Sequence, residues 1–196
     1  MKYFYTLLIS LIFLAGCETQ NHHKNQITYR FNDQNQNSIR IQTNFDTLNI
    51  DTKASRENQD MDKITLIMFL DLNSQNAKDY IFNINHLRLT FPKAYIVGIL
   101  TNPVPQEQVD EYIQKNQVNF PILNPGDNKN LFFDFAKKIN TIDNPPQTQA
   151  TDAQIPTLEI PYFVLYDKHA NKYQTYSGFI PEEMFAYDIG VLSKKY

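Results

Sequence analysis

The sequence is poor in cysteine: its 196 residues contain one, Cys17. A chain with one cysteine cannot form an internal disulfide, and it cannot supply the pair of thiols that disulfide exchange requires. No glycine-rich phosphate-binding loop is visible either. These absences exclude an internal disulfide scaffold and dithiol chemistry.

The chain also lacks a strong charge of either sign. It has 18 basic and 21 acidic residues, and its formal net charge is −3. A nearly balanced surface gives no electrostatic reason to expect nucleic acid as a partner, and it argues against binding to anionic lipid through a basic patch. Apolar residues make up 42 %, with 14 Phe and 12 Tyr, so we expect a globular domain of ordinary size.

The N-terminus has the layout of a secretory signal. Lys2 is the only charged residue before Cys17, and an apolar stretch runs over residues 7–14. This stretch is shorter than the roughly 20 residues of a transmembrane helix, and it matches the apolar core of a signal peptide. Residues 14–17, Leu-Ala-Gly-Cys, resemble the lipobox of bacterial lipoproteins.

The lipobox resemblance implies that residues 1–16 are removed as a signal peptide and that Cys17 carries lipid, including an acyl chain such as palmitate. Several acyl chains together make a durable membrane anchor. An uncleaved membrane anchor with an incidental cysteine is the alternative. Glu18 stands where the inner-membrane retention signal of enteric bacteria has Asp. We therefore expect a lipid-anchored, periplasm-facing protein of the cell envelope, with the outer membrane favoured over the inner.

The rest of the chain divides by its hydropathy pattern. Residues 17–25 are polar and predict a flexible lipidated tether. Residues 26–60 contain two short alternating stretches, 26–31 and 38–42, which predict an N-terminal β-hairpin followed by a loop. Residues 61–196 alternate between strand and helix patterns, which predicts an α/β domain with a mixed sheet and helices on both faces.

Two kinds of pattern define the elements of this domain. Continuous apolar runs predict buried strands, and apolar stripes at helical spacing predict amphipathic helices. The expected strands cover 64–70, 94–100, 120–123, 162–166 and 172–177, and the expected helices cover 74–91, 106–116, 130–139 and 181–192. The polar loop over 140–158 is unusually long, which predicts a functional or disordered insertion.

This order of elements resembles the thioredoxin fold, and in particular the membrane-tethered thiol–disulfide oxidoreductases of the TlpA/ResA type. Ile64–Leu70 precedes the first helix, as the active-site strand does in that family. Phe120–Pro125 resembles the family's Phe-Pro segment, and Ile160–Asp167 resembles its cis-proline strand. Gly178 stands where the family has a glycine after the last strand. The resemblance implies a three-layer sandwich with residues 26–42 as an N-terminal hairpin extension.

The chain lacks the two cysteines with which that family carries out thiol–disulfide exchange. The family places Cys-x-x-Cys at the start of the first helix, where this chain has Ser74, Gln75, Asn76 and Ala77. Exchange needs a thiolate and a second thiol, whereas a serine hydroxyl stays protonated at neutral pH and alanine has no reactive group. His86 lies too far along the helix to act as a base for Ser74. We therefore predict no catalytic residue, no cofactor, no metal and no enzymatic activity.

Pro161 is the strongest remaining candidate for a functional residue. The resemblance implies that its peptide bond is cis and that Ile160 offers its backbone to a bound peptide beside Ser74 and Gln75. This predicts a redox-inactive domain that binds another envelope protein or peptide, as a scaffold or assembly factor. Two alternatives stay open: a structural accessory of the envelope with no ligand in the groove, and an enzyme of unknown reaction that needs no thiol.

Overall fold

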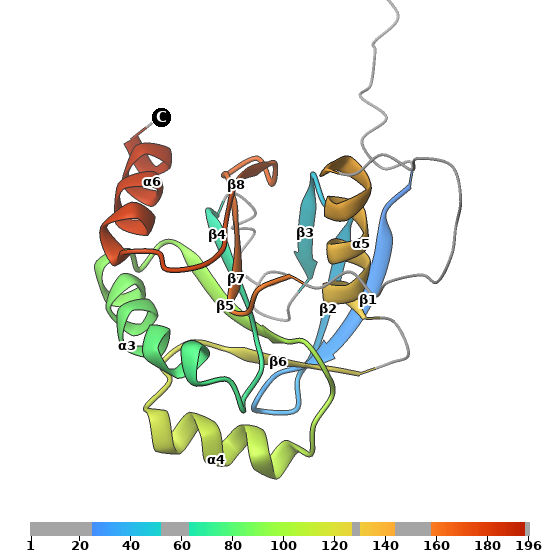
Figure 1. Cartoon of the computed structure of the whole chain (residues 1–196), viewed down its shortest axis with the longest axis vertical. Helices are drawn as coiled ribbons and strands as arrows, with labels where there is room; N and C mark the ends of the chain where they lie inside the picture. Colours follow the sequence, from blue (N-terminus) through green and yellow to red (C-terminus); the bar gives the residue numbers. More distant parts are fainter. Residues whose placement is uncertain (1–24, 52–62, 127–129, 144–157, 195–196) are drawn as a thin grey trace, which may run out of the picture.

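The computed structural model describes residues 25–51, 63–126, 130–143 and 158–194 (Figure 1). The predicted signal peptide, the lipidation of Cys17, nearly all of the tether and most of loop 140–158 lie outside the described residues. Among the helices of the described part, none combines the length and the apolar character needed to cross a membrane.

Eight strands form one mixed sheet in the order β3-β2-β1-β6-β5-β4-β7-β8. Strand β4 pairs in parallel with β5 and antiparallel with β7, so the mixed sheet predicted from the sequence is confirmed. The strands are β1 (Ile27–Asn32), β2 (Ser38–Thr43), β3 (Leu48–Asp51), β4 (Thr65–Leu70), β5 (Tyr95–Leu100), β6 (Ile122–Pro125), β7 (Tyr162–Tyr166) and β8 (Lys172–Tyr176).

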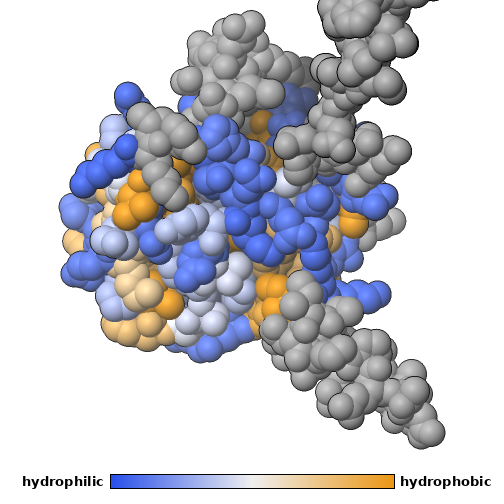
Figure 2. All heavy atoms as spheres, turned by 90° about the horizontal axis from the view of Figure 1, so that it is seen from above, coloured by the Kyte–Doolittle hydropathy of each residue, from blue (hydrophilic) through white to orange (hydrophobic). Residues whose placement is uncertain are grey.

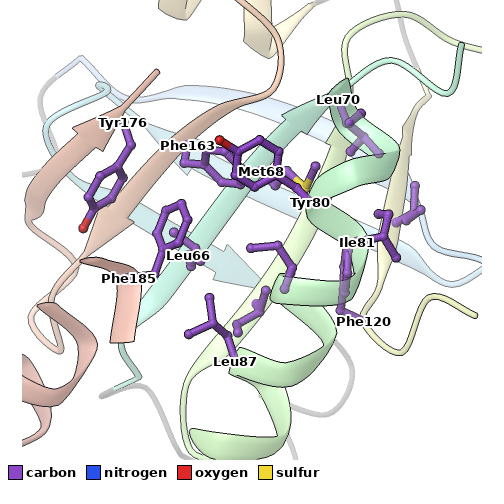
Figure 3. Close-up of a cluster of buried hydrophobic side chains, with 14 of the residues drawn as sticks. Leu66, Met68, Leu70, Tyr80, Ile81, Leu87, Phe120, Phe163, Tyr176 and Phe185 are labelled. Atoms are coloured by element: carbon purple, nitrogen blue, oxygen red, sulfur yellow. The ribbon is translucent and has the colours of Figure 1, made fainter. Parts of the chain in front are cut away.

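Helices cover both faces of the central strands. Helices α3 (Gln75–Thr90), α4 (Gln106–Asn116) and α6 (Glu182–Lys194) share one apolar cluster with the sheet, and α5 (Leu131–Asp143) belongs to a second cluster on the opposite face. Every residue of β4 is buried because its side chains alternate between these two clusters. Leu66, Met68 and Leu70 contribute to the first cluster, which Figure 3 shows, and Phe69 contributes to the second.

The N-terminal segment is a three-stranded part of the main sheet. Strand β3, which the sequence patterns did not predict, pairs with β2. Strand β1 pairs with β6 at Phe31↔Pro125 and Asn32↔Asn124, so the predicted hairpin joins the sheet at its β6 side. Tyr29 and Phe31 share the second apolar cluster with residues of α5. Helix α5 therefore packs on one face of the sheet, against both the central and the N-terminal strands.

The first and last strands of the sheet meet at one end of the molecule. Thr47 forms a β-bridge with Asn171 in the turn between β7 and β8, and the amide of Lys172 donates to the carbonyl oxygen of Asp46 at 2.7 Å. Burial acts to raise the pKa of Asp46, but hydrogen bonds from Lys138 and Lys172 outweigh burial and lower it. Seen from above, the visible surface is mainly hydrophilic, with small separate apolar patches (Figure 2).

Candidate functional site

A pocket of about 260 Å³ lies where three segments of the chain come together. Its walls are the first half of α3, the segment that enters β7 and the segment between β8 and α6. The lining residues are Asn76, Asp79, Tyr80, Asn83, Glu159, Ile160, Pro161, Gly178, Phe179 and Ile180. Three residues predicted from the sequence, Asn76, Ile160 and Pro161, therefore share one pocket.

The four residues at the start of α3 have different roles. Ser74 is the N-cap, and its hydroxyl oxygen accepts a hydrogen bond from the amide of Ala77 at 3.3 Å. Gln75 is exposed and donates to Asp79, whereas Ala77 is completely buried. Ser74 and Gln75 are not among the residues that line the pocket, whereas Asn76 is. The hydroxyl of Ser74 therefore caps the helix.

The second wall is the segment that leads into β7. The peptide bond between Ile160 and Pro161 is cis, as the family resemblance implies. Pro161 is buried and Ile160 is half-buried, and both line the pocket. Pro161 immediately precedes Tyr162, the first residue of β7, so the central sheet holds this wall in place.

The third wall is tied to α3 by one side chain. The hydroxyl of Tyr80 donates to the carbonyl oxygen of Gly178 at 2.8 Å and accepts from the amide of Ile180 at 2.6 Å. Gly178 has a φ of 74°, which glycine adopts without the strain that other residues meet. Phe179, between the two bonded residues, is 90 % exposed. Tyr80 therefore fixes a segment that presents an aromatic ring to solvent.

Replacing Tyr80 by Phe is expected to lower the free energy of unfolding by about 1–3 kcal/mol, because the buried amide of Ile180 loses its acceptor. Urea denaturation followed by circular dichroism measures the loss. Hydrogen exchange at the Ile180 amide should also become faster. The control is Tyr187→Phe on α6, where the side chain is 71 % exposed. Unchanged exchange at Ile180 would show that Tyr80 does not hold this segment.

Two further polar contacts hold α6 against the structure around the pocket. His86 on α3 contacts the carboxylate of Glu182 at the start of α6. Tyr176, the last residue of β8, donates its hydroxyl to Asp188 at 2.7 Å. Burial and this hydrogen bond raise the pKa of Tyr176 far above its ordinary value, so its phenol stays protonated. Helix α6 is thus fixed to both α3 and β8.

The pocket contains carboxylates, amides and apolar groups, but no thiol, because the single cysteine of the chain is Cys17. Within the described ranges, no group of three or more His, Cys, Asp or Glu residues is placed to hold a metal ion. Sequence reasoning missed Asp79 and Phe179. The spacing of Asn76, Tyr80 and Asn83 along one helical face was the available signal for the α3 wall.

The sheet order, the helices on both faces and the cis-proline beside the start of α3 define a thioredoxin-like α/β fold. A thiol:disulfide interchange protein of Chlorobium tepidum has the same fold, with a TM-score of 0.55 and 12 % identity over 84 % of this chain and 92 % of that chain. No family model and no curated protein sequence matches the chain.

Two other solved structures share the fold. BsSco, a member of the Sco family of cytochrome c oxidase assembly proteins, has a TM-score of 0.54 and 9 % identity, over 92 % of this chain and 98 % of its own. The exposed lipoprotein thioredoxin Etrx1 of Streptococcus pneumoniae has a TM-score of 0.53 and 9 % identity, over 84 % of this chain and 99 % of its own. At these identities the likeness establishes the fold.

Proposed function

We propose that this chain is a lipid-anchored protein of the bacterial cell envelope whose thioredoxin-like domain binds an extended segment of another envelope protein. The domain acts as a scaffold or assembly factor and carries out no thiol exchange. The observation that carries the proposal is the open pocket at Pro161 in a chain that has one cysteine. The pocket is present without the pair of thiols that exchange requires.

The size and lining of the pocket favour a peptide segment as its occupant. At about 260 Å³ it is smaller than the roughly 300–1,000 Å³ of typical cofactor and small-molecule sites. This volume suits one or two side chains of an extended segment. Such a segment can pair its backbone with that of Ile160 in the manner of an added strand. The exposed ring of Phe179 supplies the kind of aromatic contact that protein interfaces favour.

The membrane anchor in this proposal rests on Cys17 and the segment before it. The short apolar run and the lipobox-like residues 14–17 support lipidation of that cysteine. The same fold occurs in the Streptococcus pneumoniae protein that is named as an exposed lipoprotein.

In-cell photocrosslinking tests the proposal. The photoreactive amino acid p-benzoylphenylalanine replaces Phe179, which lines the pocket, or Tyr187, which is a comparably exposed aromatic residue on α6. We expect a discrete adduct with one envelope protein from position 179 and none from position 187. Adding Asn83→Trp, which fills the pocket from α3, should abolish the adduct, and circular dichroism checks that this variant folds.

Equal crosslinking at positions 179 and 187 would contradict the proposal, as would an adduct that persists with Asn83→Trp. Absence of any adduct at position 179 would also contradict it. Each of these results favours the structural accessory, in which the pocket has no ligand.

A further inference from the structure

The charges around the pocket are all of one sign. Asp79 and Glu159 carry carboxylates, and none of the lining residues is basic. Asp79 accepts a hydrogen bond from the side-chain amide of Gln75 at 3.1 Å, and no basic residue in the described part of the chain forms an ion pair with it. Glu159 is exposed and makes no hydrogen bond or ion pair with any residue in the described part of the chain. An anionic occupant would meet two unpaired negative charges here.

The two carboxylates stand at different walls of the same pocket. Asp79 lies next to Tyr80 on α3, and Tyr80 bonds the carbonyl oxygen of Gly178. A Cβ atom added to Gly178 would lie 3.8 Å from a carboxylate oxygen of Glu159. Gly178 therefore lies beside Glu159 and is bonded to α3, the helix that carries Asp79, and both carboxylates line the pocket.

The pocket also offers apolar surface to a ligand side chain that enters it. Phe179 exposes its ring beside the pocket, and Ile160 adds an aliphatic surface. Arginine and lysine have long aliphatic stems that pack on apolar surface, and their charged ends are attracted to carboxylates and to aromatic faces. Arginine suits this setting best, because its planar group also binds carboxylates through paired hydrogen bonds.

We propose that the occupant of the pocket is an extended peptide segment that places an arginine or lysine side chain between Asp79 and Glu159, with its stem against Phe179. This inference rests on the proposed function and specifies the chemistry of the partner. It predicts that the partner presents a basic residue in an extended segment, and that segments with acidic side chains do not bind in the pocket.

Binding to positional peptide libraries tests the inference. The probes are pools of blocked hexapeptides in which one position is fixed as Arg, Lys, Gln or Glu and the others are randomised. The full chain, purified in detergent, should retain the Arg and Lys pools about fivefold better than the Gln pool, and the Glu pool least, because two partly exposed ion pairs are gained. The double variant D79N/E159Q should remove this preference.

The control variant is D110N/E111Q on α4, which makes the same change of charge at exposed positions outside the pocket. Asp110 accepts a hydrogen bond from Gln106 at 2.9 Å, as Asp79 does from Gln75, so the local helix environments match. This variant should keep the preference for basic pools. Asn83→Trp should abolish retention of every pool.

Each other outcome overturns the inference. Equal retention of all pools, lost with Asn83→Trp, would mean that the pocket binds peptides without selecting a basic side chain, so that the proposed function survives alone. A basic preference that persists in D79N/E159Q would mean that charges elsewhere cause it. If no pool is retained above the Asn83→Trp background, the inference is also refuted. The proposed function is tested separately, by crosslinking at position 179.

Discussion

Introducing two cysteines, Ser74→Cys and Ala77→Cys, is expected to give this chain thiol–disulfide exchange activity. The hydroxyl oxygen of Ser74 lies 3.3 Å from the amide nitrogen of Ala77, at the positive end of the α3 dipole. A sulfur atom in its place accepts from the same amide, so the thiol pKa should fall by about one unit or more from its ordinary value near 8.5. Position 77 is one helical turn further on, where a second thiol can resolve a mixed disulfide.

Alkylation by iodoacetamide as a function of pH measures the pKa of the thiol at position 74, and insulin reduction measures turnover. All chains compared should also carry Cys17→Ser, so that no third thiol contributes. The single variant S74C should be alkylated readily without turning over, and A77C should react slowly because position 77 is buried. A thiol at position 74 with an ordinary pKa would show that the first turn of α3 does not stabilise an anion there.

Replacing Phe163 by Ala should cost about 3–5 kcal/mol of the free energy of unfolding, a large part of the roughly 5–15 kcal/mol typical of a folded domain. Phe163 is completely buried on β7. Its ring centroid lies 5.2 Å from that of Tyr80 and 4.9 Å from that of Phe185. Figure 3 draws these three side chains within the first apolar cluster. The substitution therefore removes the ring that supports both Tyr80 at the pocket and α6.

Urea denaturation followed by circular dichroism measures this effect. The conservative variant Phe163→Leu should cost less, about 1–1.5 kcal/mol, because most of the apolar volume remains. Phe179→Ala should change stability by less than about 0.5 kcal/mol, since Phe179 is 90 % exposed. If Phe163→Ala cost no more than Phe179→Ala, the packing described for the first apolar cluster would be wrong.

The sequence predicted the central strands and the four helices because each carries its own signal. Strand β4 contains the continuous apolar run Leu66–Leu70, and Ser74 is a capping residue in front of a helical stripe. Strand β3 has no comparable signal: of Leu48–Asp51 only Leu48 is buried, and pairing with β2 defines the strand. The strand expected over 120–123 is observed at Ile122–Pro125, because its last two residues pair with β1.

The candidate site was only partly predictable for a similar reason. Pro161 and the start of α3 were found because they resemble segments of a known fold. Asp79, Glu159 and Phe179 lie in three separate segments, and no local pattern connects them. They meet because β7 and α3 both begin at the same end of the central strands and Tyr80 fixes the segment around Gly178 to α3.

The bridge between Thr47 and Asn171 also marks the end of the domain at which the described chain begins. The chain enters β1 beside this bridge, since the side chain of Gln26 donates to Thr47 at 3.3 Å. Pro161 is at the opposite end of β7, a strand of five residues and therefore about 17 Å long. Figure 1 shows β1 starting at one end of the molecule and α3 starting toward the other. A lipid on Cys17 would therefore attach the chain at the end of the domain opposite the pocket, which leaves the pocket clear of the attachment point.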